Sequence, residues 1–156
     1  MTNNSLVIRN ATIVDGTGAD PFKGDVALEN GIIKEAGIVE NNYNDEIDAK
    51  GLILAPGFID IHTHFDPQLC WDGYATPSIE HGVTTVVTGN CSLSLAPIRN
   101  GGEEKIISMF QVIEDIKKPT FDAAVPFSWE TFGEYLDHIK PNLGINVGAL
   151  IGHSAV

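Results

Sequence analysis

The chain has 156 residues, 43% hydrophobic and 19% charged, which suffices for a domain with a real core and excludes collagen-like and disordered classes. The formal net charge is -12, from 9 Lys and Arg against 21 Asp and Glu, so neither nucleic acid nor an anionic membrane is expected as a partner. Two cysteines make no disulfide framework, and we expect no signal peptide or membrane span, hence a cytoplasmic protein.

The first third, residues 1–55, is predicted to be mainly antiparallel β-structure. Apolar and polar residues alternate over residues 25–29, as in a half-buried strand. Asn30-Gly31 then favours a tight type I′ turn into a return strand over residues 32–36. The remaining elements expected here are strands over residues 6–10, 11–14 and 51–55, and a polar loop over residues 41–48.

From residue 56 onward the pattern changes to strands separated by helical segments, which is typical of βα units and a parallel sheet. The runs predicted as strands cover residues 58–64, 83–88 and 145–151. The predicted helices cover residues 76–80 with Thr76 as N-cap, residues 103–116 with Lys117-Lys118 at the C-terminal end, and residues 129–139 between Ser128 as cap and Pro141.

Two histidines and one cysteine stand where adjacent strands of this sheet would end. His62 and His64 are two residues apart on a strand, so they project from one face, with Asp60 one step deeper. Cys91 follows the next strand and would lie beside them if the two strands are neighbours. Imidazole nitrogen and thiolate sulfur are good zinc ligands, so the sequence predicts a metal site there. The same residues also fit a solvated histidine pair and a small buried cysteine.

Longer motifs around these residues resemble a known family. The segment from Pro56 to His64 resembles the first-strand signature of the amidohydrolase superfamily. The segments that follow resemble the N-acyl-D-amino-acid deacylases, or D-aminoacylases, namely Asp66, Gln68-Leu69, Trp71-Asp72, His81 to Val87, Gly89-Asn90-Cys91, Ala96-Pro97, residues 129–137 and Gly152-His153-Ser154-Ala155.

The resemblance implies the N-terminal part of a (β/α)₈ TIM barrel, preceded by strands of a small β-sandwich in residues 1–55, with the first three βα units in residues 56–156. It also implies zinc-dependent hydrolysis of the amide bond of small N-acyl-D-amino acids, with one or two ions. The family's ligand roles carry over to His62, His64 and Cys91. Asp60, Asp66 and His153 are candidates for supporting the ligands.

Two departures from the family pattern affect these expectations. Ser92 stands where the family usually has Gly after the ligand Cys, which constrains the loop if a positive φ is needed. The family also takes two further histidines and a catalytic aspartate from later strands, expected beyond Val156. We therefore expect an N-terminal fragment that is inactive alone and needs the remainder of its chain to close the barrel. Oligomeric state and acyl preference stay open.

Three other functions are compatible with parts of the sequence. A cyclic-amide hydrolase, such as a hydantoinase or dihydroorotase, shares the His-x-His pair but uses a carbamylated lysine in place of Gly-Asn-Cys. Cys91 with His153 could form a thiol nucleophile and its base, although this leaves the His-x-His pair unused. A truncated product without catalytic activity is the third.

Overall fold

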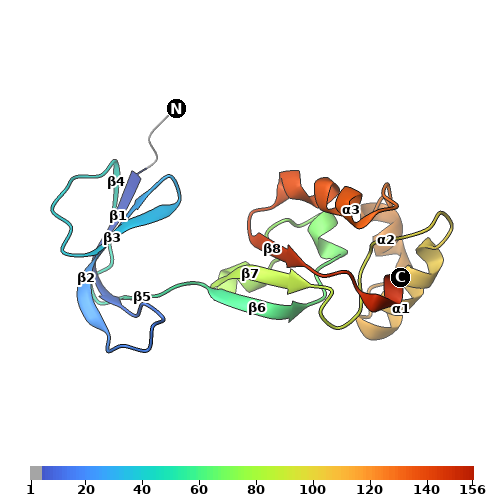
Figure 1. Cartoon of the computed structure of the whole chain (residues 1–156), viewed down its shortest axis with the longest axis horizontal. Coiled ribbons are helices and arrows are strands. Elements are labelled where there is room, and N and C mark those ends of the chain that lie inside the picture. The colour runs from blue at the N-terminus through green and yellow to red at the C-terminus, as the bar shows by residue number, and fades with distance from the viewer. Residues whose placement is uncertain (1–4) are drawn as a thin grey trace. The chain divides into compact units, whose positions relative to one another are not determined.

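The computed structural model describes residues 5–156, which divide into two compact units between Pro56 and Gly57 (Figure 1). The strands are β1 (Ser5–Ile13), β2 (Phe22–Glu29), β3 (Ile32–Gly37), β4 (Asp45–Asp48), β5 (Ile53–Leu54), β6 (Phe58–Thr63), β7 (Val83–Thr88) and β8 (Asn146–Ala149). The α-helices are α1 (Glu103–Ile113), α2 (Lys118–Ala124) and α3 (Phe132–Ile139), and the 3₁₀ turns are η1 (Gln68–Cys70), η2 (Ser78–His81), η3 (Lys140–Asn142) and η4 (His153–Ala155). None of the described helices is long and apolar enough to cross a membrane.

The first unit is a sheet in the order β3-β2-β1-β4, with β5 also paired to β1. β1, β2 and β3 pair antiparallel, and the predicted hairpin turn is confirmed, because Asn30 and Gly31 have φ of 52° and 78°. The prediction of a polar loop over residues 41–48 is wrong at its C-terminal end, because residues 45–48 form β4, which pairs with β1. β4 and β5 both run parallel to β1, so this unit is not purely antiparallel.

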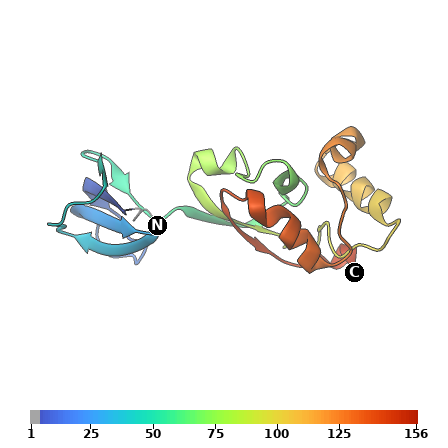
Figure 2. The ribbon, with the colours of Figure 1, turned by 90° about the horizontal axis from the view of Figure 1, so that it is seen from above.

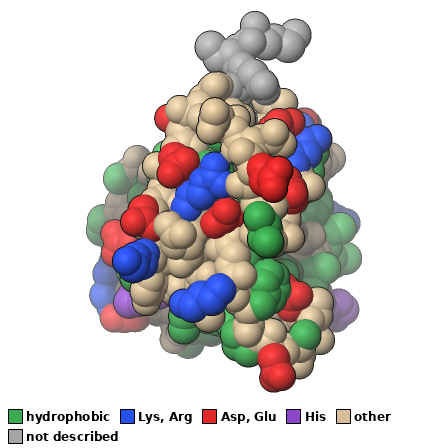
Figure 3. All heavy atoms as spheres, turned by 90° about the vertical axis from the view of Figure 1, so that its left-hand side faces the viewer, with side chains coloured by type: hydrophobic (Ala, Val, Ile, Leu, Met, Phe, Trp, Pro, Cys, Tyr) green, Lys and Arg blue, Asp and Glu red, His purple; other side chains and the backbone are tan. Residues whose placement is uncertain are grey.

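Charged side chains of both signs cover the side of the first unit shown in Figure 3. Arg9 is the cation of the first unit with the most polar partners. Its Nη1 lies 3.1 Å from Asp25 Oδ2, and its Nε lies 3.3 Å from Glu46 Oε2. Beneath this surface the buried residues include Val7, Ala11, Ile13, Val26 and Ala27. The apolar positions that alternate along β1 and β2 thus supply the core of the unit.

The second unit contains a parallel sheet in the order β6-β7-β8, which confirms the predicted parallel strands. The strand boundaries agree closely for β7, whereas β8 is shorter than the run of residues 145–151. Figures 1 and 2 show α1 and α2 beyond the carboxyl ends of these strands and α3 beside the sheet near β8. The connection from β6 to β7 holds only 3₁₀ turns, while the connection from β7 to β8 holds all three α-helices of the described chain.

Several helix boundaries differ from the sequence-based prediction. The cap of α3 is Thr131 and not Ser128: Thr131 Oγ1 accepts a hydrogen bond from Glu134 N, and Glu134 Oε2 accepts one from Thr131 N. α1 ends at Ile113, and Lys118 opens α2, which the sequence pattern does not predict. The segment expected as a helix over residues 76–80 is the short turn η2, without a side-chain cap at Thr76.

Helices and loops of the second unit share one core. Phe110 of α1, Phe121 of α2 and Tyr135 of α3 are all at most 1% exposed. Trp129 is buried against Tyr135, with ring centroids 5.2 Å apart, and its Nε1 donates a hydrogen bond to Leu95 O at 3.0 Å. Trp129 is therefore a packing residue. This core fixes the loops that follow β6 and β7.

Candidate metal centre

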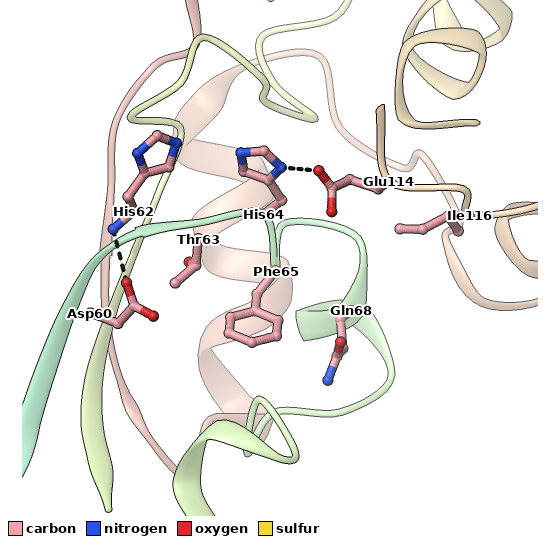
Figure 4. Close-up of a pocket in the computed structure, with 8 residues that line it drawn as sticks. All are labelled: Asp60, His62, Thr63, His64, Phe65, Gln68, Glu114 and Ile116. Carbon is pink, nitrogen blue, oxygen red and sulfur yellow. Dashed lines mark hydrogen bonds and ion pairs between the residues drawn. The ribbon is translucent and has the colours of Figure 1, made fainter. Parts of the chain in front are cut away.

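The strand β6 presents both histidines at its carboxyl end. His62 lies within the strand and His64 follows its last residue, and the two rings project to the same side (Figure 4). Their ring centroids lie 5.6 Å apart with planes tilted by 44°. Thr63, between them, is buried, and its hydroxyl donates a hydrogen bond to Val87 O at 3.0 Å on the neighbouring strand. The alternation of side chains along the strand thus produces the paired imidazoles.

The loop after β7 carries Cys91 and is attached to β6 by its own motif. Asn90 Nδ2 donates a hydrogen bond to Ile61 O at 2.9 Å. Gly89 has φ of 79°, and a Cβ there would lie 2.1 Å from Leu150 O, so this position combines a left-handed conformation with a close backbone contact. The three residues of Gly89-Asn90-Cys91 therefore have different roles. Gly89 allows the close backbone contact, Asn90 attaches the loop to β6, and Cys91 supplies the thiol.

One atom each of His62, His64 and Cys91 forms a group whose members all lie within 4.8 Å of one another. The Sγ of Cys91 lies 2.5 Å from Nε2 of His64. Zinc bonds imidazole nitrogen at about 2.0 Å and thiolate sulfur at about 2.3 Å, so atoms this close can converge on one ion through small side-chain rotations. The donor set of two imidazoles and one thiol fits that ion. The structure thus brings together the three residues that the sequence predicts as ligands.

The residue after Cys91 adopts a conformation that glycine would adopt more easily. Ser92 has φ of 79°, in the left-handed region. Its carbonyl accepts hydrogen bonds from Ser154, from N at 3.2 Å and also from the hydroxyl. A Cβ on Gly152 would lie 2.3 Å from Ser92 O, so only glycine allows this approach. The segment of residues 152–154 therefore supports the Cys91 loop through its backbone.

The three supporting candidates differ in what they contact. Asp60 Oδ1 accepts a hydrogen bond from the backbone N of His62 at 3.1 Å, so it supports the strand and not the ring (Figure 4). Asp66 is 1% exposed, its Oδ2 has no hydrogen-bond partner among residues 5–156, and burial raises the pKa of its carboxyl to about 7. His153 is exposed in η4 and supplies no atom to the ligand group.

Sequence reasoning missed Glu114, whose Oε1 contacts Nδ1 of His64 (Figure 4). Glu114 follows the last residue of α1 and, with both histidines, lines an open cavity of about 590 Å³. The other lining residues are Asp60, Thr63, Phe65, Gln68 and Ile116. The one signal in the sequence is an acidic residue at the end of a helix, where the helix dipole favours cations.

The comparisons with known proteins agree with this architecture. The model of the amidohydrolase family matches residues 45–156. An N-acyl-D-aspartate deacylase of Alcaligenes xylosoxydans xylosoxydans is 36% identical over 153 residues, covering 97% of this chain and 28% of that protein. A solved D-aminoacylase superposes with a TM-score of 0.76 at 32% identity, covering 96% of this chain and 30% of the other. An N-acyl-D-glutamate deacylase of Bordetella bronchiseptica, solved with zinc and a phosphonate inhibitor, gives a TM-score of 0.70 at 30% identity, with the same two coverages.

The fold and the site together define a class of protein: an α/β fold with a parallel sheet that carries imidazole and thiol side chains at the carboxyl ends of its strands. The chain belongs to the amidohydrolase family. The predicted resemblance to D-aminoacylases is confirmed, and so is the fold class, as the N-terminal part of their fold. The chain spans 25% to 29% of the length of the first curated relatives it matches. Closure of an eight-stranded barrel stays a prediction.

Proposed function

We propose that the chain contributes His62, His64 and Cys91 to the zinc centre of a hydrolase that removes the acyl group from N-acyl-D-amino acids. The observation that carries this proposal is the group of three donor atoms within 4.8 Å of one another at the carboxyl ends of β6 and β7. The relatives support the chemistry. One has a zinc-bound structure with a mimic of the tetrahedral intermediate, and for a D-aminoacylase a binuclear centre with one-metal activation and second-metal attenuation is described.

Amide hydrolysis at neutral pH requires an activated water and stabilisation of charge on the carbonyl oxygen. Bound zinc supplies both, since it lowers the pKa of its water to about 7 and polarises the carbonyl. The residues of this chain hold the donor atoms in place. His62 and His64 are fixed by β6, and Cys91 by the Asn90 tether to that strand. The cavity beside them has room for a small substrate.

The proposal also includes that these 156 residues alone do not turn over substrate. Three strands form the described sheet of the second unit, and a TIM barrel closes with eight. His62 of the ligand group is exposed to water, so charge stabilisation is weaker than in a closed site. Hydrolysis of N-acetyl-D-amino acids with added zinc, followed as amine release, tests this. Turnover above the uncatalysed rate contradicts it.

Zinc binding to the purified chain is the direct test of the ligand assignment. Competition with a chromophoric chelator should give one tight site, and H62A, H64A or C91S should each weaken it by at least about 100-fold, since even outer-sphere partners cost about 10- to 100-fold. H81A and C70A are matched controls, because His81 ends η2 and Cys70 ends η1, outside the ligand group. Equal affinities of C91S and C70A would refute the assignment of Cys91.

A second candidate is a thiol hydrolase, and one contact favours it. The partner of Cys91 is His64, not His153, and Glu114 contacts the other nitrogen of that ring. Nucleophile, base and orienting carboxylate in this order form the arrangement of a cysteine hydrolase. A thiol hydrolase predicts turnover by these 156 residues in the presence of a metal chelator, and the turnover should persist in H62A. The zinc proposal predicts no turnover in either measurement, so the two measurements separate the candidates.

A further inference from the structure

We propose that Glu114 is a positioning residue that holds the His64 ring with its Nε2 directed at the sulfur of Cys91. The inference rests on the proposed zinc function for its biological meaning. The contact itself joins residues 50 positions apart in the chain. Its consequence is that the loop after α1 belongs to the ligand site, although it supplies no donor atom to the metal.

The two nitrogens of the His64 ring have different partners. Nδ1 contacts Glu114 Oε1, and Nε2 lies 2.5 Å from Cys91 Sγ (Figure 4 shows the first of these contacts). A neutral imidazole carries a proton on one nitrogen only. Because a carboxylate accepts and does not donate, the contact places that proton on Nδ1 and leaves the lone pair of Nε2 free for a cation. Histidine ligands in metal sites are commonly held in this way.

Helix stability does not explain a carboxylate at this position. Glu114 is the C-cap of α1, where the helix dipole disfavours negative charge. The lysines nearby are engaged elsewhere: Lys117 contacts Asp115, and Lys118 lies 2.6 Å from Asp122 Oδ1 and 3.3 Å from Glu104 Oε1. Within residues 5–156, the ion-pair partner of Glu114 is His64. The helix dipole therefore disfavours the Glu114 carboxylate at this position, and the contact with His64 offsets that unfavourable interaction.

His62 and His64 are consequently held by different means. The backbone of His62 is bonded by Asp60, and its ring is exposed. The side chain of His64 is only 20% exposed, and both of its ring nitrogens have a neighbour. We expect His64 to be the pre-oriented ligand, whereas His62 adjusts when an ion binds.

The test compares E114Q and E114A with E103Q, which is a matched control because Glu103 lies in the first turn of the same helix. The first measurement is the ring ¹⁵N spectrum of His64 in the metal-free chain. It should show one tautomer, protonated at Nδ1, in the wild type and in E103Q, and a mixture of tautomers in E114A. The second is zinc affinity, which should fall about 10- to 100-fold in E114A and by less in E114Q, with E103Q unchanged.

The outcomes separate the inference from the proposed function. A wild-type chain that binds no zinc refutes the zinc proposal, and the tautomer measurement then decides on the positioning role by itself. A wild type that binds zinc, together with an E114A variant of equal affinity and unchanged His64 tautomer, overturns the role of Glu114. Thermal unfolding provides the check on folding. Loss of a charge that opposes the helix dipole should leave the Tm of E114Q equal or higher.

Discussion

The hydroxyl of Tyr135 donates a hydrogen bond to the backbone carbonyl of Asp66 at 3.0 Å, joining α3 to the loop that follows the two histidines. Both residues are buried, and they are 69 positions apart in the sequence. Burial raises the pKa of Tyr135, so its hydroxyl stays a donor at neutral and alkaline pH. The loop after β6 is thus fixed by a helix that the sequence places after β7.

Replacing Tyr135 by Phe should destabilise the second unit by about 1–2 kcal/mol, because Asp66 O loses its donor in a buried site. Zinc affinity should fall with it, since Asp66 lies two residues after His64. Urea unfolding measures the first effect. The matched control is Y74F, because Tyr74 is 58% exposed, and this change should alter stability by less than about 0.5 kcal/mol. Equal effects of the two substitutions would show that this hydrogen bond does not stabilise the fold.

The two cysteines should differ in reactivity. Burial, with a smaller contribution from the Asp66 carboxylate, raises the pKa of the Cys70 thiol to about 12. Since the thiolate is the nucleophile, iodoacetamide at about pH 8 should modify Cys91 and leave Cys70 intact. Added zinc should protect Cys91, and a chelator should restore its labelling. Mass spectrometry of the peptides reads both sites, and labelling of Cys70 at the rate of Cys91 would contradict the assignment.

Gly89 and Gly101 offer a comparison of backbone strain with and without a close contact. Both have positive φ, 79° and 82°, but a Cβ on Gly89 meets Leu150 O at 2.1 Å, while nothing lies within 4 Å of a Cβ on Gly101. G101A should cost about 1 kcal/mol, the penalty for a left-handed alanine. G89A should cost clearly more and should weaken zinc binding, because the β7 end must move away from β8. Similar unfolding free energies for the two variants would mean that the approach of Leu150 O to Gly89 adds nothing to the penalty.

Ser92 provides a prediction of the opposite sign. Its φ of 79° penalises a side chain, and the side chain is exposed. S92G should therefore raise stability by up to about 1 kcal/mol, with the strain relieved partly offset by the greater freedom of glycine in the unfolded chain. The Tm of the second unit measures it. Because the contacts of Ser154 go to the Ser92 backbone carbonyl, zinc affinity should not change. A lower Tm would mean that the hydroxyl makes a stabilising contact.

The first unit should show a pH dependence that originates in Asp25. A hydrogen bond from Asn10 N, and then the neighbouring Arg9, lower the pKa of this carboxyl. A lowered pKa stabilises the folded state at pH values above the unfolded-state pKa of about 3.9. This stabilisation is lost as the pH falls through the lower pKa of the folded state. D25N should thus be less stable than the wild type at neutral pH, with the difference vanishing in strong acid. Hydrogen exchange of β1 and β2 amides measures it, with D20N as control.

The sequence predicts the strands of the second unit well, because β-branched runs such as residues 83–88 are unambiguous. It also predicts the ligand group, since the spacing of His62 and His64 fixes their common face. The predicted cap of α3 is wrong although Thr131-x-x-Glu134 is visible in the sequence, and Ser128 has no Glu or Gln three residues later.

Other elements could not be predicted from local pattern. β4 consists of exposed residues, Asp45 to Asp48, and exists because β1 has a free edge for it. Likewise, the contact of Glu114 with His64 depends on where α1 ends in space. The residue pattern over 103–114 cannot predict this contact, because His64 precedes Glu114 by 50 positions in the chain.

The backbone contacts of Gly89 with Leu150 and of Gly152 with Ser92 have a consequence for how such a site can diversify. The position of the sulfur is set by two glycines and by the Asn90 side chain, and none of these residues lines the neighbouring cavity. Side chains that line the neighbouring cavity, such as Gln68 and Ile116, can therefore be exchanged without displacing the thiol. A protein built in this way can change the molecules it accepts while the atoms that hold its ion stay where they are.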